Sequence, residues 1–130
     1  MKIIDGTNAA MGRLASFAAK EALKGEEIAI VNCNKVIITG NRKNIEADFQ
    51  QKRGRVGTLQ VGPLVSKSNE KIVKRTIRGM LPDFRVGRGR EAFKRIRCYN
   101  LVPKEYEAQE KIKLEKTKPK KAVSLESMRK

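Results

Sequence analysis

Two short apolar runs separated by one helical segment constrain the fold of this chain more than any other feature. Ile3-Ile4 predicts a short strand, residues 9–24 predict a helix, and the continuous apolar run 28–31 is typical of a strand buried on both faces. A strand, a helix and a second strand in this order form a βαβ unit, whose two strands run parallel. The sequence therefore predicts an α/β fold.

Further elements follow downstream. The apolar run 36–39 predicts another strand buried on both faces, residues 42–52 and 69–81 predict helices, and residues 95–99 alternate as in a strand at a sheet edge. The residues between the second and third helices are rich in glycine and predict a loop or irregular strands. Together these elements predict a three-layer α/β/α arrangement with a small, mostly parallel sheet and helices on both faces.

A change in composition after Pro103 divides the chain. Residues 1–103 hold most of the apolar runs and are predicted to form one α/β domain. Residues 104–130 mix Lys and Glu, contain Pro119 and carry few large apolar side chains. We expect this part to be a basic C-terminal extension with little core of its own.

Positive charge is unevenly distributed along the chain. The formal net charge is +16 over 130 residues, yet residues 1–50 carry seven basic and six acidic side chains and are nearly neutral. Residues 71–97 carry ten basic and only two acidic side chains. Fixed cations at this density repel one another unless an anion is near. We therefore expect the partner to be a nucleic-acid backbone.

The predicted helix at 69–81 separates its cations from its apolar side chains. One stripe at positions i, i+3, i+4 and i+7 is entirely cationic, and it consists of Lys71, Lys74, Arg75 and Arg78. The opposite side carries Ile72, Val73, Thr76, Ile77 and Met80. One face of this helix is therefore predicted to pack on the core while the other presents four cations to a partner.

Other basic positions lie outside this stripe. The loop 52–55 combines Lys and Arg with a glycine that lets the backbone approach a groove closely. The arginine–glycine segment 85–90 predicts a flexible turn before a short helix that carries Phe93. Arginine guanidinium groups in such a turn pair bidentately with phosphates. Arg95 and Arg97 share one face of the predicted edge strand. Arg13 lies in the first turns of the first helix, near its positive end, where a phosphate binds favourably.

The chain lacks the residues needed for common catalytic and metal chemistry. It contains no histidine, and Glu26 and Glu27 are adjacent at a strand start, so their side chains point to opposite faces. The turn 6–14 matches neither a P-loop nor a dinucleotide-binding fingerprint. The two cysteines form no C-x-x-C pair. We therefore expect no enzymatic activity, no cofactor, no metal and no small-molecule substrate.

The sequence also indicates the cellular compartment in which the protein is expected. Cys33 and Cys98 lie in apolar runs and are expected to be buried, reduced thiols. The N-terminus lacks the apolar segment of a secretory signal, and no run approaches the roughly 20 residues that span a bilayer. We expect a soluble, cytoplasmic protein with no membrane partner.

The choice between RNA and DNA depends on the few aromatic residues. The chain has four Phe and two Tyr, shows no stacking platform, and matches neither the RNA-recognition-motif consensus nor a helix-turn-helix or zinc-finger pattern. We therefore expect recognition of the backbone and shape of folded RNA. A chromatin-type basic protein that binds DNA has the same charge and is the alternative.

Several segments resemble, in their order and spacing, the universal ribosomal protein L13 family of the large subunit. They include Gly12-Arg13-Leu14-Ala15-Ser16, the run 31–40, Arg78-Gly79-Met80-Leu81-Pro82, Gly87-Arg88, Phe93 and the run 95–99. The resemblance covers about residues 2–103. The short middle region and the ending 121–126 are similar to the archaeal branch of the family.

This resemblance implies a structural component of the large ribosomal subunit that binds large-subunit (23S-type) rRNA, assists assembly and lies beside neighbouring ribosomal proteins in the cytoplasm. It implies rRNA contacts at Arg78, Arg88, Arg95 and Arg97, and the charge argument adds further cations. The predicted rRNA-binding residues are therefore Arg13, Lys52, Arg53, Arg55, Lys71, Lys74, Arg75, Arg78, Arg85, Arg88, Arg90, Lys94, Arg95 and Arg97.

Overall fold

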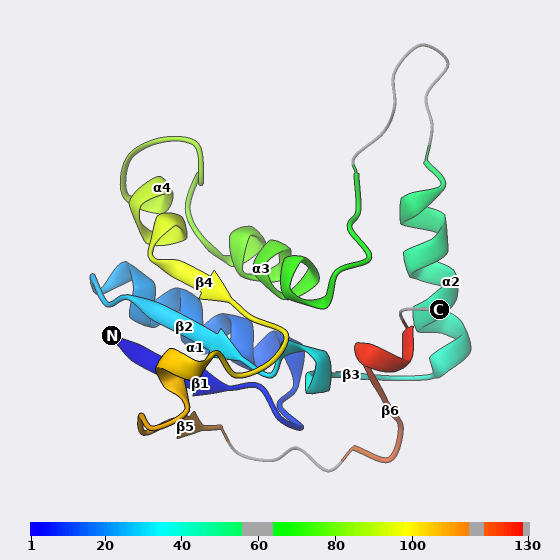
Figure 1. Ribbon diagram of the computed structural model, residues 1–130. Helices are drawn as coiled ribbons and strands as arrows, with labels where there is room; N and C mark the ends of the chain where they lie inside the picture. The colour runs from blue at the N-terminus through cyan, green and yellow to red at the C-terminus, as the bar shows by residue number, and fades with distance from the viewer. Residues whose placement is uncertain (56–63, 115–118, 129–130) are drawn as a thin grey trace.

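The computed structural model describes residues 1–55, 64–114 and 119–128, and its centre is a four-stranded parallel sheet in the order β4-β2-β1-β5 (Figure 1). The strands are β1 (Lys2–Asp5), β2 (Ile28–Val31), β4 (Ile96–Cys98) and β5 (Ile112–Lys113). Helix α1 (Met11–Leu23) connects β1 to β2, which pair in parallel with Ile4 opposite Ile30. The predicted βαβ unit and the α/β fold with a small, mostly parallel sheet are therefore confirmed.

Three helices cover one face of this sheet. Helix α3 (Asn69–Met80) packs along α1 and contacts β4, and α4 (Gly87–Lys94) contacts α1 and β4. The core on this face joins the inward isoleucines of the strands to the buried face of α1 and to Val73 and Ile77 of α3. In α1 that face is mostly alanine, which lets the neighbouring elements approach closely.

The second face of the sheet is covered by a much thinner layer. Ile3, Ala29 and Val31 point to this face and pack against Tyr106, with Tyr99 half-buried beside them. Tyr106 belongs to the short 3-10 helix η2 (Lys104–Tyr106). The layer on this face is thus a 3-10 helix and its loops where α-helices were expected, because the sequence after Pro103 has no apolar stripe at helical spacing.

The apolar run 36–39 does not join the parallel sheet. Strand β3 (Ile37–Thr39) pairs antiparallel with β6 (Ala122–Ser124), with Ile38 opposite Val123. Its isoleucines are only half-buried, so the prediction of a strand buried on both faces is wrong. A parallel crossover needs about a dozen residues, whereas residues 32–36 alone separate β2 from β3. Asn32 turns the chain there in the left-handed region, at φ 57°.

The segment after Pro103 contributes to both sheets. Strand β5 extends the parallel sheet beside β1, and β6 completes the two-stranded sheet. Val123, Leu125 and Met128 are buried in the main core, and Met128 lies in the 3-10 helix η3 (Glu126–Met128). The division of the chain into a domain and an extension at residue 103 stays a prediction, but part of the extension is packed into the domain.

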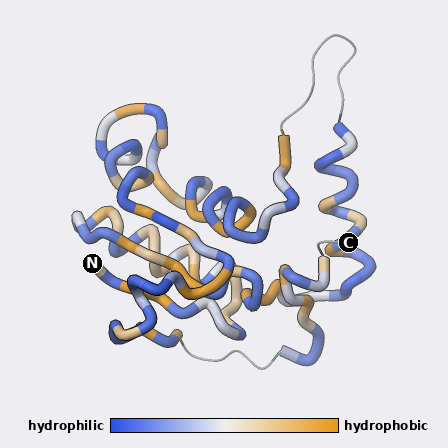
Figure 2. Tube along the Cα trace, viewed as in Figure 1, coloured by the Kyte–Doolittle hydropathy of each residue, from blue (hydrophilic) through white to orange (hydrophobic). Residues whose placement is uncertain are grey.

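Helix α2 (Arg42–Arg53) stands at the side of the molecule, next to η3 (Figure 1). Arg42 donates from Nη2 to the carbonyl oxygen of Ser127 at 3.4 Å. None of the residues of α2 is buried, although Ile45 and Phe49 pack against the main core. Figure 2 shows most of this helix as hydrophilic. The position of α2 therefore depends on a small apolar contact.

The two cysteines are free thiols, as predicted. Cys33 is buried and Cys98 is half-buried. A hydrogen bond with the Cys98 thiol, together with burial, raises the pKa of Cys33 far above its ordinary value. Cys33 therefore stays protonated at neutral pH and serves as a small apolar group of the core.

Glu21 is an acid buried on the alanine face of α1. Its carboxylate is paired with Lys2 and, at 2.8 Å, with Lys24. The hydrogen bonds from Lys2 and Lys24 outweigh desolvation and lower the pKa of Glu21 to about 2. This ion pair could not be predicted from the sequence pattern, because Lys2 and Glu21 are far apart along the chain.

The Glu21 pair predicts a pH-dependent stability. A carboxyl whose pKa is lowered on folding stabilises the fold fully above its ordinary value of 4.5 and loses that contribution as the pH falls to about 2. The unfolding free energy of Glu21→Gln, measured by urea titration, should lie below that of the unchanged protein at neutral pH and converge with it near pH 2. Glu46→Gln, in an exposed pair with Arg42, is the control. A Glu21→Gln difference that does not change with pH would contradict the assignment.

Leu125 provides a test of the C-terminal segment. Its side chain is fully buried, so Leu125→Ala should leave a cavity and lower the unfolding free energy by about 2–5 kcal/mol. Leu101→Ala is the matched control, because Leu101 is 66% exposed and its loss should change stability by less than about 0.5 kcal/mol. Equal effects of the two changes in urea unfolding would show that the segment does not support the core.

Candidate nucleic-acid interface

Helix α3 has the two-sided character that its sequence predicts. Ile72, Val73 and Ile77 are buried against the core. On the other side Lys71 is exposed, and the remaining cations of the stripe are half-buried. Met80 was expected on the apolar face, but it is 44% exposed because the helix ends at this residue. The cationic stripe is therefore held outward by apolar packing on the opposite side.

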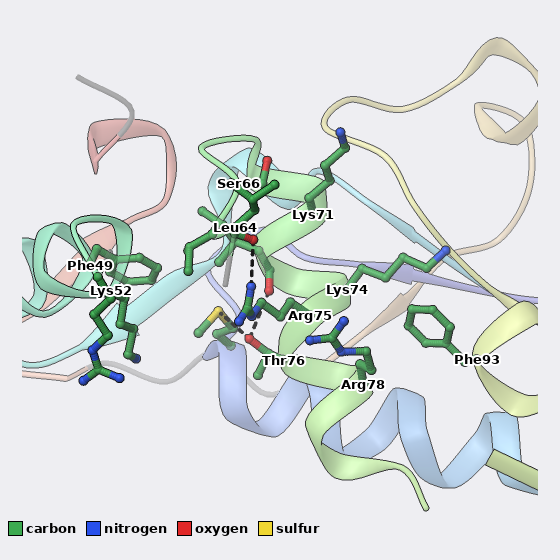
Figure 3. Close-up of a pocket in the computed structure, with 14 residues that line it drawn as sticks. Phe49, Lys52, Leu64, Ser66, Lys71, Lys74, Arg75, Thr76, Arg78 and Phe93 are labelled. Carbon is green, nitrogen blue, oxygen red and sulfur yellow. Dashed lines mark hydrogen bonds between the residues drawn. The ribbon is translucent and has the colours of Figure 1, made fainter. Parts of the chain in front are cut away.

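A groove of about 560 Å³ runs between α2 and α3, and we call it the α2–α3 groove (Figure 3). Its lining comes from α1, α2, α3, α4 and the chain before α3. None of the described residues that line it is acidic. Six of the predicted cations lie along it, namely Lys52, Arg55, Lys71, Lys74, Arg75 and Arg78.

The α2 side of the groove is organised by Phe49. Lys52 Nζ lies 5.8 Å from the centroid of the Phe49 ring, and the guanidinium carbon of Arg53 lies 5.5 Å from it. Lys52 also forms an ion pair with Asp48, at 3.0 Å between Nζ and Oδ2. Cations over an aromatic face are attracted by its quadrupole, so the ring holds both side chains near the end of α2.

The α3 side of the groove is fixed by hydrogen bonds. Arg75 donates from Nη1 to the carbonyl oxygen of Leu64 at 2.9 Å, which ties the helix to the preceding segment. Thr76 donates to the carbonyl oxygen of Ile72 at 3.1 Å and lies 3.6 Å from the sulfur of Met11. The guanidinium of Arg75 is therefore oriented before any ligand arrives.

A pair of phenylalanines supports the cations toward α4. The rings of Phe84 and Phe93 lie 6.1 Å apart and are tilted by 59°. Lys74 Nζ lies 4.9 Å from the Phe93 centroid, and the guanidinium carbons of Arg78 and Arg85 lie 4.7 and 5.4 Å from that of Phe84. Three cations from two segments thus share one aromatic support, which limits the conformational entropy they lose on binding an anion.

The arginine–glycine segment is helical where a flexible turn was expected. Helix α4 begins at Gly87, so Arg88 and Arg90 lie in its first turn, about 200° apart around the axis. Both are exposed, and Arg85 precedes the helix. Gly89 is buried in this helix, and a Cβ there would collide with the carbonyl oxygens of Pro82 and Asp83. The segment is therefore tightly packed against the preceding loop.

Two glycines give a matched test of this packing. Gly89→Ala should lower the unfolding free energy by about 1–3 kcal/mol, because the loop backbone has to move. Gly79→Ala in α3 meets nothing within 4 Å and should raise it by about 0.5–1 kcal/mol through helix propensity. Thermal unfolding of both variants checks this, and a neutral Gly89→Ala would contradict the close approach.

Arg95 and Arg97 do not share a face of a strand. Arg95 is the C-cap of α4 and donates from Nη1 to the carbonyl oxygen of Ala22 at 3.3 Å, near the C-terminal end of α1. It is also paired with Glu91, at 3.8 Å. Arg97 lies in β4 opposite Ala29, so it points to the second face of the sheet, away from the groove. With Lys94, both line a small depression beside Glu27.

The remaining predicted cations lie elsewhere on the surface. Arg13 is exposed in the first turn of α1 and does not line the groove. Arg53 is half-buried and faces a second depression that includes Arg42, Lys67 and Met128. The structure thus brings six of the fourteen predicted residues into one groove, and the other eight do not line it.

The aromatic supports were missed by the sequence analysis. Phe49 and Phe93 line the groove, and Phe84 lies behind Arg78. The scarcity of aromatic residues suggested that no stacking platform exists, but each of these three rings stands close in sequence to Lys or Arg. That proximity was the available signal, and the three-dimensional packing of α2, α3 and α4 was needed to interpret it.

The carboxyl ends of β1 and β2 are occupied by a structural network. Asp5 accepts hydrogen bonds from the backbone and hydroxyl of Thr7, at 3.0 and 2.7 Å, and from Asn32 at 3.0 Å. Partial burial acts to raise the pKa of Asp5, but these hydrogen bonds outweigh it and lower the pKa below its ordinary value. At this edge, where α/β proteins commonly bind nucleotides, Oδ1 of Asp5 is therefore already engaged by Thr7 and Asn32.

Within residues 1–55, 64–114 and 119–128, no group of three His, Cys, Asp or Glu side chains is arranged to hold a metal ion. No helix in the same part of the chain is both long and apolar enough to cross a membrane.

The fold and the groove define a small α/β protein with a cationic concave surface that suits a polyanion. The family model described as ribosomal protein L13 matches residues 1–105, and the chain belongs to this family. The family is one of ribosomal proteins and not of enzymes.

Three similar relatives are archaeal, in agreement with the resemblance to the archaeal branch. Large ribosomal subunit protein uL13 of Methanocaldococcus jannaschii is 44% identical over 123 residues, which is 91% of this chain and 89% of the relative. The protein of the same name from Thermoplasma volcanium is 44% identical over 104 residues, covering 80% and 75%. That from Methanopyrus kandleri is 47% identical over 102 residues, covering 78% of this chain and 63% of the relative.

Proposed function

We propose that this protein is a structural component of the large ribosomal subunit that binds large-subunit rRNA through phosphate contacts and assists assembly of the subunit. The observation that carries this proposal is the α2–α3 groove, in which six cations and no acid gather among the described lining residues of a protein from a ribosomal family. Such a surface releases counterions from a nucleic-acid backbone when it binds.

The distribution of the other cations supports a cross-linking role. The groove opens between α2 and α3, Arg88 and Arg90 lie exposed on α4, and Arg97 faces the other side of the sheet. A protein with cations on several faces of a rigid platform holds more than one RNA segment at fixed relative positions. Arg95 contributes by joining α4 to α1, through its hydrogen bond to Ala22, rather than as an exposed cation.

The proposed partners are large-subunit rRNA and neighbouring proteins of the same subunit. As a large-subunit component the protein works in the cytoplasm and needs no cofactor or small-molecule substrate.

Salt dependence tests the phosphate contacts. Six groove cations predict a slope near −5 for the logarithm of affinity against the logarithm of salt concentration. Lys71→Ala and Arg55→Ala, both exposed in the groove, should each reduce the magnitude of this slope by about one. The measurement is filter binding of the full chain to a transcript of 23S-type rRNA in roughly 50–400 mM KCl.

Controls keep this test specific to the groove. Lys20→Ala removes the same charge from the exposed side of α1 and should leave the slope unchanged. A slope flatter than about −3 for the unchanged protein would contradict the multi-phosphate contact. Tighter binding to duplex DNA than to the rRNA at equal salt would favour the chromatin-type alternative.

A further inference from the structure

The α2–α3 groove combines apolar surface with charge, and phosphate binding alone does not use the apolar part. The apolar part of its lining consists of Phe49, Leu64, Met11 and Ile72. Figure 3 shows Phe49 on the α2 side and Leu64 beside α3. Leu64 is 85% exposed and Met11 is half-buried, so apolar atoms are accessible there. A contact made only to phosphates would leave this surface in water.

Cations line the same groove as these apolar side chains. Lys52 and Arg55 come from the end of α2, and Arg75 lies between Leu64 and Thr76, with its guanidinium fixed by the Leu64 carbonyl. Figure 3 shows Phe49 and Lys52 on one side of the groove and Arg75 on the other. The arrangement combines apolar side chains and cations in one groove, as a planar base and its own phosphate require.

The size and charge of the groove select among nucleic-acid ligands. A volume of about 560 Å³ lies within the range of pockets that hold small organic ligands. The bases of a duplex are stacked inside it and offer no base face to such a site. A nucleotide that leaves the stack presents both an apolar face and a phosphate, and proteins bind such bases on aromatic rings and guanidinium planes.

We propose that the α2–α3 groove binds an unpaired nucleotide of the RNA, with its base against Phe49, Leu64 and Met11 and its flanking phosphates on Lys52, Arg55 and Arg75. This inference rests on the proposed function, since it names the form of RNA that the groove takes. It departs from the expectation that the protein contacts only backbone and shape, because the fold gathers aromatic and apolar side chains that are dispersed along the sequence.

Three RNA hairpins that differ only at one position test the proposal. The first carries a single bulged 2-aminopurine, the second an abasic ribose in the same bulge, and the third has the position paired. The first two have equal numbers of phosphates, so a difference between them reports on the base alone. The full chain should bind the 2-aminopurine hairpin roughly five- to a hundredfold more tightly than the abasic one, as expected for one stacked base. The fluorescence of the 2-aminopurine should be quenched when the protein binds this hairpin.

Matched variants locate the base in the groove. Phe49→Leu keeps an apolar side chain but removes the ring, and it should bring the affinity ratio of the first two hairpins close to one. Phe17→Leu makes the same change on α1, at a half-buried position outside the groove, and should leave the ratio unchanged. Circular dichroism confirms that both variants are folded.

The outcomes separate this proposal from the function on which it rests. Equal affinity for the 2-aminopurine and abasic hairpins, or an unchanged ratio in Phe49→Leu, would overturn the nucleotide site and leave rRNA binding intact. Failure of the unchanged protein to bind both the hairpins and the 23S-type transcript would overturn the proposed function itself. Displacement of the hairpin by a poly-glutamate peptide at lower concentration would assign the groove to an acidic protein segment instead.

Discussion

The alanine face of α1 is the constraint on which the rest of the structure depends. Ala15, Ala18 and Ala22 are fully buried, and α3 packs along the same helix while also contacting β4. Larger side chains at these positions would move α3 away from the sheet, and with it the cationic stripe and the groove. The buried Glu21 is tolerated on this face only because two lysines pair with it. A short sheet and one close-packed helix thus position every cation of α3.

Three cations of α3 are held by weak contacts rather than by acids. Lys74 and Arg78 lie over aromatic rings, and Arg75 donates to a backbone carbonyl, so their charges stay largely uncompensated in the free protein. Carboxylate partners would have reduced the repulsion but would also compete with phosphates. Aromatic rings and carbonyl oxygens orient a cation while leaving its net charge available. The groove is therefore preorganised for an anion at some expense in the stability of the free fold.

The sequence was sufficient for features set by local periodicity and insufficient for those set by distant packing. The βαβ unit and the two sides of α3 follow from apolar spacing, and both are confirmed. The partner of β3 lies beyond residue 120 in a polar segment, so no local sequence pattern predicted the second sheet. The short helix predicted around Phe93 begins already at Gly87, and glycine content alone does not reveal that the backbone at Gly89 lies too close to Pro82 for a Cβ. The groove likewise exists only because α2 and α3 are brought together.

The two sides of the groove are not equally rigid, and this difference bears on how RNA binds. Helix α3 is anchored by buried side chains such as Val73 and Ile77, whereas α2 has no buried residue and rests on the half-buried Ile45 and Phe49. Both sides carry cations, so in the free protein their repulsion acts mainly on α2, the more weakly held side. An anionic strand between them removes that repulsion and adds contacts to Lys52 and Arg55. In the proposed complex, part of the binding free energy is used to fix α2, which would couple RNA binding to the local stability of this helix.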